Sequence, residues 1–321
     1  MTGYLLRRVG ASLLLLLAVL TLTFFFVHAA PGEPTAVLDV PTLPREAREH
    51  LRRLYGLDRP LGEQYVAWLR AALSGDLGVS YRHQQPALEV LLRAFPNTLA
   101  LGAAALLVSY TLALPLGIAA ARRHGSAFDH GVRFGTLLLY SLPLFWTGLL
   151  AILLFSHVWP ILPAGSVHSP QAAFLSPFGR FLDFLRHLLL PALVLGAGLA
   201  ASTTQFVRNG LVEVLQQDYL TTARAKGLTE RRVVWLHALR NALPPIVHLF
   251  GLSLPALLNG SLVVEVVFSW PGLGRLTYDA LLARDYPLIL ASVVVSGTLV
   301  IAGNLVADLL HAAVDPRVRH A

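Results

Sequence analysis

The segment "DYLTTARAKGLTERRVVWLHALRNALPP", residues 218–245, lies between two apolar runs that are each long enough to cross a bilayer. It carries acids and bases and includes Lys226, the only lysine of the chain. A plain loop would be rich in Gly, Pro and Ser without a particular pattern, whereas most of this segment favours helix. The segment is therefore a compact, charged, structured element inside a very hydrophobic chain.

Its pattern predicts a helix–glycine–helix hairpin. Residues 206–226 favour a helix that continues out of the preceding apolar run, and Gly227 stands where a left-handed residue ends it. Thr229 can cap a second helix, with Glu230 in its first turn. Apolar residues follow there at helical spacing: Val233, Leu236 and Leu239. The residues just before the glycine are small, which allows another surface to approach closely: Thr222, Ala223 and Ala225.

The composition indicates a membrane protein. Only 13% of the residues are charged, against roughly 25% in soluble domains, so lipid is expected to solvate much of the surface. The net charge of +7 does not indicate nucleic acid binding, because the arginines are scattered between apolar runs. The chain has no cysteine, which excludes disulfides, a thiol nucleophile and a thiolate metal site.

Six apolar runs without a charged residue reach the length of about 20 residues that a spanning helix needs. They are Val9–Ala30, Thr98–Ala121, Phe134–Trp159, His187–Val207, Leu243–Val264 and Tyr286–Ala307. Inside lipid each must be helical, because its backbone groups find no water to bond, and the prolines at Pro115 and Pro143 are tolerated there. The sequence therefore predicts an all-α integral membrane protein with six transmembrane helices. A soluble all-α protein would need charged stripes at helical spacing, which these runs lack.

The first run has an alternative interpretation as a signal peptide. Arg7 and Arg8 supply a basic start, and "VHAAPG" resembles a cleavage site. The apolar stretch of residues 9–27 is, however, longer than the usual apolar region of about 7–15 residues in such a peptide. A retained first helix is favoured.

The distribution of Lys and Arg predicts the orientation. With both termini in the cytoplasm, the hairpin and most of the basic residues fall on the cytoplasmic side. The short loops opposite hold only Arg180, Arg186, Arg275 and Arg284. The long segment between the first two runs has balanced charge and is long enough to escape this rule.

Three connections on the external side differ in character. Within residues 31–94, "PTLPREAREHLRRLYGLDRPLGEQYVAWLRAAL" predicts one or two short amphipathic helices. "WPILPAGSVHSPQAAFLSPFGR" is rich in proline and predicts an external loop. In "EVVFSWPGLGRLTYDALLARD", three residues demand a tight, unusual backbone path: Pro271, Gly272 and Gly274.

The hairpin resembles the cytoplasmic loop motif of the membrane-spanning subunits of ABC importers, often written EAA-x3-G. Thr221, Thr222 and Ala223 occupy its first three positions and Gly227 its glycine. The first-position Glu is Thr here, and the proline that usually follows the glycine is displaced to Pro244. These departures look like the dipeptide/oligopeptide branch, as do "LLRRV", "APGEP", "GDLGVSY" with "FPNTLAL", "VEVVFSWPGLGRL" and the terminal "DPRVR". The resemblance covers essentially the whole chain in order.

The resemblance implies the type I permease fold and a division of the chain. Residues 1–30 form the first helix, 31–94 the external segment, 95–311 a five-helix core with a coupling hairpin at 208–241, and 312–321 a cytoplasmic tail. It implies a subunit of an ATP-driven importer in the bacterial inner membrane, with di- or oligopeptides as cargo. Nickel, glutathione or another small solute is the alternative, because this branch reuses one scaffold.

The resemblance also implies partners in the bilayer: a second homologous permease, expected to be a different chain, two ATP-binding subunits and an extracytoplasmic solute-binding protein. This chain binds no cofactor, and the partner ATPases use ATP and Mg²⁺. The chain itself is not an enzyme, because a phosphate-binding loop needs Gly-Lys and Ala225 precedes its only lysine. Its histidines form neither H-E-x-x-H nor close pairs at ligand spacing, so no metal site is predicted.

Three groups of candidate site residues follow. The contacts with the ATPase subunit are Asp218, Tyr219, Thr222, Ala223, Ala225 and Gly227, while Arg224 and Lys226 are either salt-bridge donors at the rim or anchors on the positive side. The external gate or binding-protein contact is assigned to Glu265, Pro271, Gly272 and Gly274, unless "PGLG" is a plain turn. The candidates for pathway lining are Ser202, Thr203, Thr204, Asn259 and Asn304, for which helix–helix hydrogen bonding is the alternative.

An ion-coupled carrier working alone is the competing class. Such a carrier needs intramembrane acids. The nearest candidates, Glu265 and Asp308, lie at the ends of their runs, where an interfacial position is expected, and no acid lies well inside any run. This argues for the importer subunit.

Overall fold

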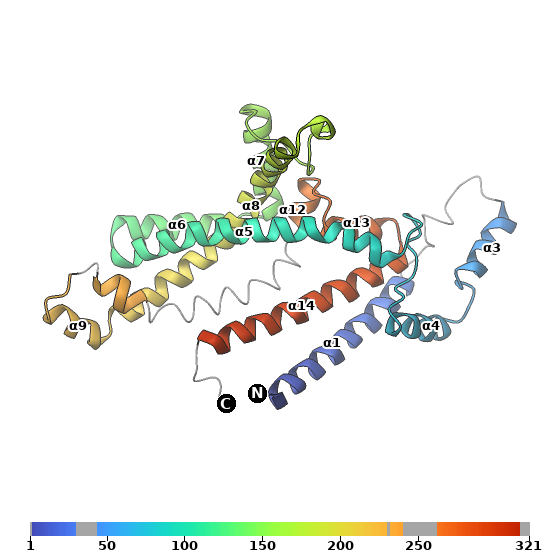
Figure 1. Cartoon of the computed structure of the whole chain (residues 1–321), viewed down its shortest axis with the longest axis horizontal. Coiled ribbons are helices and arrows are strands. Elements are labelled where there is room, and N and C mark those ends of the chain that lie inside the picture. The colour runs from blue at the N-terminus through green and yellow to red at the C-terminus, as the bar shows by residue number, and fades with distance from the viewer. Residues whose placement is uncertain (1, 30–43, 230–231, 240–261, 315–321) are drawn as a thin grey trace. The chain divides into compact units, whose positions relative to one another are not determined.

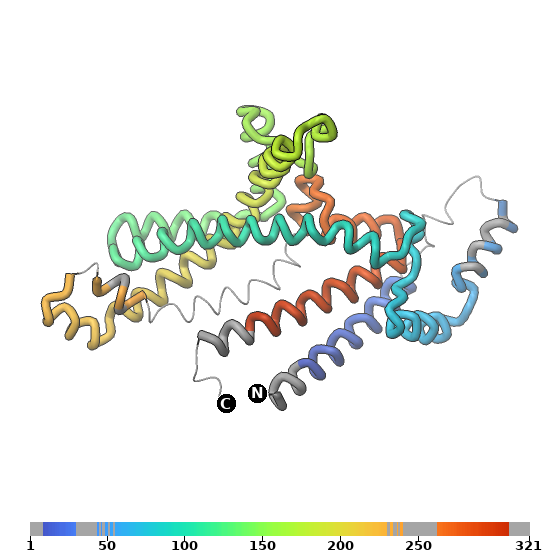
Figure 2. Tube along the Cα trace, viewed as in Figure 1, coloured from blue at the N-terminus to red at the C-terminus, as the bar shows by residue number. Residues whose placement is uncertain are grey.

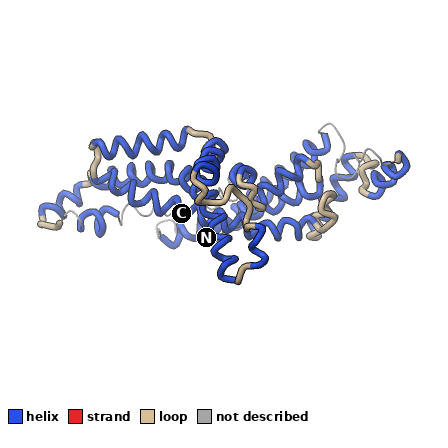
Figure 3. Tube along the Cα trace, turned by 90° about the horizontal axis from the view of Figure 1, so that it is seen from above, coloured by secondary structure: helices blue, strands red, loops and turns tan. Residues whose placement is uncertain are grey.

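The computed structural model describes residues 2–29, 44–229, 232–239 and 262–314. These residues are almost entirely helical, joined by short loops (Figure 3), and no strand occurs among them. The chain divides into two compact units, residues 1–98 with 271–301 (unit 1) and residues 99–270 with 302–321 (unit 2). Helices α5 and α14 each contribute to both units (Figure 1).

Unit 1 holds the first helix and the external segment. Its helices are α1 (Thr2–Ala29), α3 (Arg45–Leu54), α4 (Leu61–Leu73), α13 (Leu273–Leu282), the start of α5 (Ala87–Arg122) and most of α14 (Tyr286–Val314). The two short amphipathic helices predicted in the external segment are α3 and α4. Between α4 and α5 the chain forms a turn-rich connection.

Unit 2 holds the remainder of α5 and the segments that follow it. They are α6 (Ala127–Ser141), α7 (Leu144–Ile152), the π-helix η1 (Leu153–Val158), the 3-10 helix η2 (Pro170–Phe174), α8 (Pro177–Leu215), α9 (Asp218–Ala225), the π-helix η3 (Val233–Ala238) and α12 (Leu262–Val267). Helix α8 begins inside the region predicted as loop, because Pro177 occupies the first turn and Ser176 Oγ accepts from Gly179 N at 3.2 Å.

Four helical stretches are long and apolar enough to cross a membrane: Val9–Ala29, Ala87–Arg122, Pro177–Leu215 and Tyr286–Ala307. They contain four of the six predicted spans. A fifth stretch is not one straight helix, since α6 and η1-bearing α7 meet at a bend of 97° (Figure 1). The sixth predicted span, Leu243–Val264, lies largely outside the described residues, which include only its end in α12.

The prediction of one continuous helix over Phe134–Trp159 is wrong, and Pro143 is the reason. Proline restricts the residue before it to extended backbone, and Leu142 has φ −78° and ψ 133°. Helix α6 ends there, and Pro143 caps the start of α7. The prolines at Pro115 and Pro191 lie inside α5 and α8 without ending them. Proline in an apolar run therefore breaks one helix of this chain and is absorbed by two.

Helices α5 and α8 approach each other closely in unit 2, where two glycines make room. A Cβ on Gly196 would lie 2.7 Å from the Ala105 carbonyl oxygen, and a Cβ on Gly117 would lie 2.8 Å from the Val207 side chain. Small residues at such crossings let membrane helices pack backbone against backbone. This contact holds α8 in place and so positions everything that follows it in unit 2.

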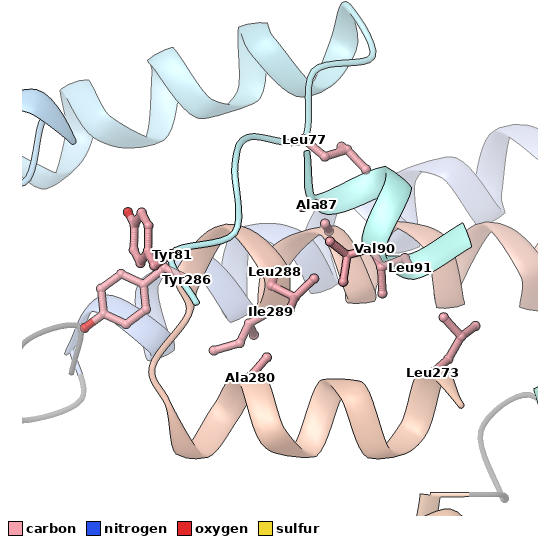
Figure 4. Packing of buried hydrophobic residues seen from close by; sticks show 11 residues of the cluster. Leu77, Tyr81, Ala87, Val90, Leu91, Leu273, Ala280, Tyr286, Leu288 and Ile289 are labelled. Carbon is pink, nitrogen blue, oxygen red and sulfur yellow. The ribbon is translucent and has the colours of Figure 1, made fainter. Parts of the chain in front are cut away.

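The core of unit 1 gathers around the start of α14 (Figure 4). Leu288 and Ile289 of α14 face Ala280 of α13, with Val90 and Leu91 of α5 beside them. These side chains are buried. The core thus joins segments that are far apart in sequence.

A buried carboxylate fastens the connection before α5 to the start of α14. Asp285 is fully buried and accepts four hydrogen bonds. Ser80 Oγ donates to it at 2.5 Å, the Tyr81 and Arg82 amides each at 3.1 Å, and the Leu288 amide at 3.3 Å. Asp285 is thereby the N-terminal cap of α14 and the anchor of residues 80–82 at once.

Replacing Asp285 with alanine is expected to lower the free energy of unfolding by about 3 kcal/mol, because several buried donors lose their acceptor. The unfolding midpoint of the purified full-length protein in detergent measures this. Asp279→Ala is the matched control, since its carboxylate is 40% exposed and lies 3.9 Å from Arg275; it should leave the midpoint nearly unchanged. Equal effects of the two substitutions would contradict the anchoring role of Asp285.

Candidate coupling site

The hairpin begins with a break that the sequence did not predict. Helix α8 ends at Leu215, Gln217 is extended (φ −72°, ψ 141°), and α9 starts at Asp218 (Figure 2). The prediction of one helix over residues 206–226 is therefore wrong. In an uninterrupted helix Asp218 would follow the buried Leu211 by seven residues and share its face. The break instead turns Leu220 inward.

The turn after α9 confirms the prediction for Gly227. Gly227 is left-handed, with φ +79°. Its amide donates to the Arg224 carbonyl at 2.9 Å, and the Leu228 amide reaches back to the Ala223 carbonyl at 3.4 Å. This pair of bonds is the Schellman motif, which satisfies the last carbonyls of a helix. The local sequence thus fixes where α9 ends and how the chain leaves it.

One face of α9 is packed into the protein. Leu220 is fully buried and Ala223 is 8% exposed. They belong to a cluster of buried residues from α5, α8, α9 and η3: Ile118, Ala121, Val207, Leu211, Leu220, Ala223, Val233 and Ala238. Leu228, next to the turn, packs against the same cluster. The cluster seats α9 on the ends of two long helices of unit 2.

The helix after the turn differs from the prediction. Val233 and Ala238 are fully buried, whereas Leu236 is 60% exposed. Residues 233–238 form a π-helix, in which residues five apart share a face. The 3.6-residue spacing that grouped Val233, Leu236 and Leu239 therefore predicted the wrong face for Leu236. Thr229 still begins this stretch, because its carbonyl accepts from the Val233 amide at 3.0 Å.

The opposite face of α9 is open. Asp218, Tyr219, Thr222 and Ala225 are exposed, and so is Gly227 in the turn. Of the six residues predicted to contact an ATPase subunit, only Ala223 points into this chain. Its small side chain lets α9 approach the cluster, so its role in this structure is to seat the helix.

A buried ion pair that the sequence analysis missed lies beside this seat. The Arg208 guanidinium on α8 donates to both oxygens of Asp129, from Nε at 2.9 Å and from Nη2 at 2.6 Å. The two side chains are 9% and 1% exposed. Gly125 N also donates to Asp129 at 3.0 Å, and His124 Nδ1 lies 2.7 Å from Arg208 Nη2. The pair ties the turn between α5 and α6 to α8.

A local signal for Asp129 was present in the sequence. Ser126 and Asp129 have the spacing of an N-terminal helix cap, and the Asp129 amide does donate to Ser126 Oγ at 3.3 Å. Nothing in the sequence pairs Asp129 with Arg208, which the charge distribution grouped with the cytoplasmic arginines. The fold alone brings them together.

The predicted pathway residues do not share one surface. Ser202 is exposed and lines a groove of about 620 Å³ between α6 and α8, together with Arg133, Tyr140 and Gln205. Thr203 is buried, and its hydroxyl donates to the Leu199 carbonyl within α8 at 2.9 Å. Thr204 is buried and Asn304 half-buried, while Asn259 lies outside the described residues.

Glu265 differs from its expected interfacial position, because its side chain is fully buried in unit 2. It belongs to α12, a short helix that ends in another Schellman motif. The Trp270 amide donates to the Glu265 carbonyl at 2.8 Å and the Ser269 amide to the Val266 carbonyl at 3.2 Å. Ser269 takes the left-handed conformation there, with φ +52°. The side chain of Asp308 is not among those described.

The unusual backbone is therefore one step away from the glycines predicted to form it. Gly272 is extended (φ −103°, ψ −176°) and precedes α13, in which Gly274 is helical. The Pro271 carbonyl accepts from Asn97 Nδ2 at 2.9 Å, and the Leu273 amide donates to Thr98 Oγ1 at 2.7 Å. These bonds fix the start of α13 to α5 within unit 1.

The apolar helices and the seated, partly exposed hairpin define a multi-span membrane protein of the transport class. The chain matches the family described as "Binding-protein-dependent transport system inner membrane component" over residues 113–320, and the corresponding N-terminal family over residues 1–102. The chain belongs to this family, the permease subunits of ABC importers. It is a multi-pass bacterial inner membrane protein and not itself an ATPase.

Curated relatives match along the whole chain. It is 39% identical to the oligopeptide transport system permease protein AppB of Bacillus subtilis, covering 100% of both chains. It is 38% identical to the dipeptide transport system permease protein DppB of Escherichia coli K12, covering 100% of this chain and 99% of the relative. A solved chain of the MetNI methionine ABC transporter is similar in fold, with a TM-score of 0.54 and 19% identity over 72% of this chain and 98% of that chain.

Replacing either partner of the buried ion pair is expected to destabilise the protein by about 3–5 kcal/mol, because the remaining charge stays buried without its counter-charge. The double variant Asp129→Leu/Arg208→Met should recover much of this loss. Thermal unfolding of the full-length single and double variants measures the coupling between the two sites.

Glu89→Ala is the control for this cycle, since Glu89 and Arg93 form an exposed pair at 3.6 Å. Its effect should be small. If Asp129→Leu proved as mild as Glu89→Ala, the pair would not be what holds the α5–α6 turn to α8.

Proposed function

We propose that this chain is the permease subunit of a peptide importer that works with a second, different permease, two ATP-binding subunits and an extracytoplasmic binding protein. The names of its relatives, which include a di/tripeptide permease of Pseudomonas aeruginosa at 40% identity, support peptides as the cargo. The partner subunits use ATP and Mg²⁺. Both termini and the hairpin face the cytoplasm, as the distribution of basic residues predicts.

The exposed face of α9 is proposed as the coupling surface for an ATP-binding subunit. The observation that carries this proposal is the two-sided packing of α9, with Leu220 and Ala223 inside and Asp218, Tyr219 and Thr222 outside. A partner that pushes on the outer face pushes through the buried cluster onto α5 and α8. The short helix then moves as one body with the two long helices.

The turn at Gly227 serves this proposal by keeping α9 short and its outer face unobstructed. Arg224 and Lys226 are exposed around it and add positive charge at the rim. A partner surface carrying carboxylates would complement them. Residues 271–274 and Glu265 are retained as the proposed external gate or binding-protein contact, with Glu265 acting from inside unit 2 rather than at an interface.

The groove between α6 and α8 is the proposed stretch of pathway wall in this chain. Ser202 and Gln205 supply polar groups there, and Phe134 and Tyr140 supply aromatic surface. A peptide backbone needs donors and acceptors, while its side chains need apolar contact. The mixed lining therefore suits a varied peptide better than a bare metal ion.

Replacing Gly227 with valine is expected to uncouple transport from ATP hydrolysis. A Cβ at Gly227 would meet nothing within 4 Å, so the substitution acts through the left-handed backbone alone. That strain amounts to about 1–3 kcal/mol and changes how the chain leaves α9. In the reconstituted complex, peptide uptake should fall at least tenfold while ATP hydrolysis persists.

Gly210→Val is the matched control, because Gly210 lies within α8, also meets nothing within 4 Å, and has no left-handed backbone. It should leave uptake and hydrolysis linked. Normal uptake by Gly227→Val, with the protein present in the membrane, would overturn the coupling assignment.

The cargo is tested separately with the same reconstituted complex and its binding protein. Uptake of a radiolabelled dipeptide should be saturable, should require ATP, and should be inhibited by unlabelled tripeptide. Competition by Ni²⁺ or glutathione, with no effect of peptides, would replace the peptide by one of those solutes. Uptake driven by an ion gradient without ATP would support an ion-coupled carrier instead.

A further inference from the structure

Unit 1 contains a cavity of about 390 Å³ that the transport mechanism does not use. Its walls come from the end of α1, the end of α3 and the turn after it, α4, the connection before α5, and the start of α14. Aromatic side chains form much of the lining: Phe24, His28, Tyr55, Trp68, Tyr81 and Tyr286. Arg53, Arg59 and Asp76 are its charged members.

The cavity has an excess of hydrogen-bond donors. Trp68 Nε1 is buried, and no acceptor bonds to it within the part of the chain that the structure describes. The guanidinium groups of Arg53 and Arg59 likewise form no ion pair with a described residue. Asp76 Oδ1 already accepts from the Gly78 amide at 2.9 Å. The unmet need is for an anionic oxygen, because a buried indole N–H without an acceptor is costly.

The place of the cavity indicates where such an anion comes from. Phe24 and His28 lie in the last turns of the candidate span Val9–Ala29. Phe26 on the same turn is 72% exposed, as expected of a side chain facing lipid. The end of a spanning helix lies at the depth of the lipid headgroups. The cavity therefore has an aromatic wall and donor groups at the level where phosphate groups and acyl chains meet.

An ordinary aromatic belt does not account for these features. Belt tryptophans place the ring in lipid and the N–H in water. Here the ring of Trp68 packs 5.7 Å from the ring of Phe24, and the N–H is buried in the cavity wall. A site that encloses its donor is built for a bound acceptor.

We propose that this cavity binds one phospholipid, whose phosphate accepts from Trp68 Nε1 and from Arg53 and Arg59. The glycerol and the first part of the acyl chains lie against the aromatic wall. Bound in this way, the lipid joins the external helices α3 and α4 to the ends of α1 and α14. It is a lipid site on the external segment, independent of the cargo and of the coupling hairpin.

The test is native mass spectrometry of the complete transporter complex purified from membranes, followed by titration with palmitoyl-oleoyl phosphatidylglycerol. Trp68→Phe removes the N–H and keeps an aromatic ring, and Arg53→Gln/Arg59→Gln removes two charges from exposed side chains. Each variant should lose one bound phospholipid and bind the added lipid about tenfold more weakly, the effect expected for a lost hydrogen bond to a charged group.

Arg70→Gln is the control, because Arg70 is exposed on α4 and does not line the cavity. It should retain the lipid. Size-exclusion chromatography of each complex distinguishes loss of lipid from loss of assembly. Equal lipid retention by the wild type and both cavity variants would overturn the proposal.

A second arm uses a radiolabelled tripeptide, with a free or an amidated C-terminus, on the same complex without its binding protein. Peptide binding that requires the free carboxylate and Trp68, with no change in bound lipid, would also overturn the lipid proposal and assign the cavity to peptide. Uptake of peptide with normal ATP coupling in a variant that has lost its lipid would leave the proposed transport function intact.

Discussion

Helix ends set the terms for this chain, because each end releases carbonyl and amide groups that lipid cannot bond. Two ends in unit 2 solve this in the same way. After α9 and after α12, a left-handed residue folds the chain back so that two amides reach the last carbonyls, at Gly227 and at Ser269. The polar surfaces of unit 2 can therefore be placed at its helix breaks without leaving backbone groups unsatisfied.

The same constraint explains why α9 depends on its surroundings. A helix of eight residues is too short to be stable alone, so its position comes from packing. The packing is small, since only Leu220 and Ala223 are buried from α9 itself. The turn to Leu228 adds a further apolar contact, and the ion pair of Asp129 and Arg208 holds the neighbouring α5–α6 turn. A surface seated by several modest contacts can be displaced with its neighbours as a body.

Sequence patterns predicted the features that depend on neighbours in the chain. Apolar runs gave four of the spanning stretches, and a glycine between two helical patterns gave the turn at Gly227. Features that depend on three-dimensional packing were missed. Pro143 breaks its run although Pro115 does not, and Ser269 rather than a nearby glycine is left-handed. Asp129 and Arg208, 79 residues apart, meet only because α5, α6 and α8 pack together.

The distribution of basic residues shows why one residue type can carry two messages. Counted along the sequence, Arg208 is one more charge on the cytoplasmic side. In the fold it is buried against Asp129 and contributes little to the surface field, whereas Arg224 and Lys226 remain exposed around the Gly227 turn. The orientation argument survives the loss of Arg208, because it rests on many residues. A docking argument does not, since it depends on which charges a partner can reach, and only Arg224 and Lys226 of these three stand at the rim of α9.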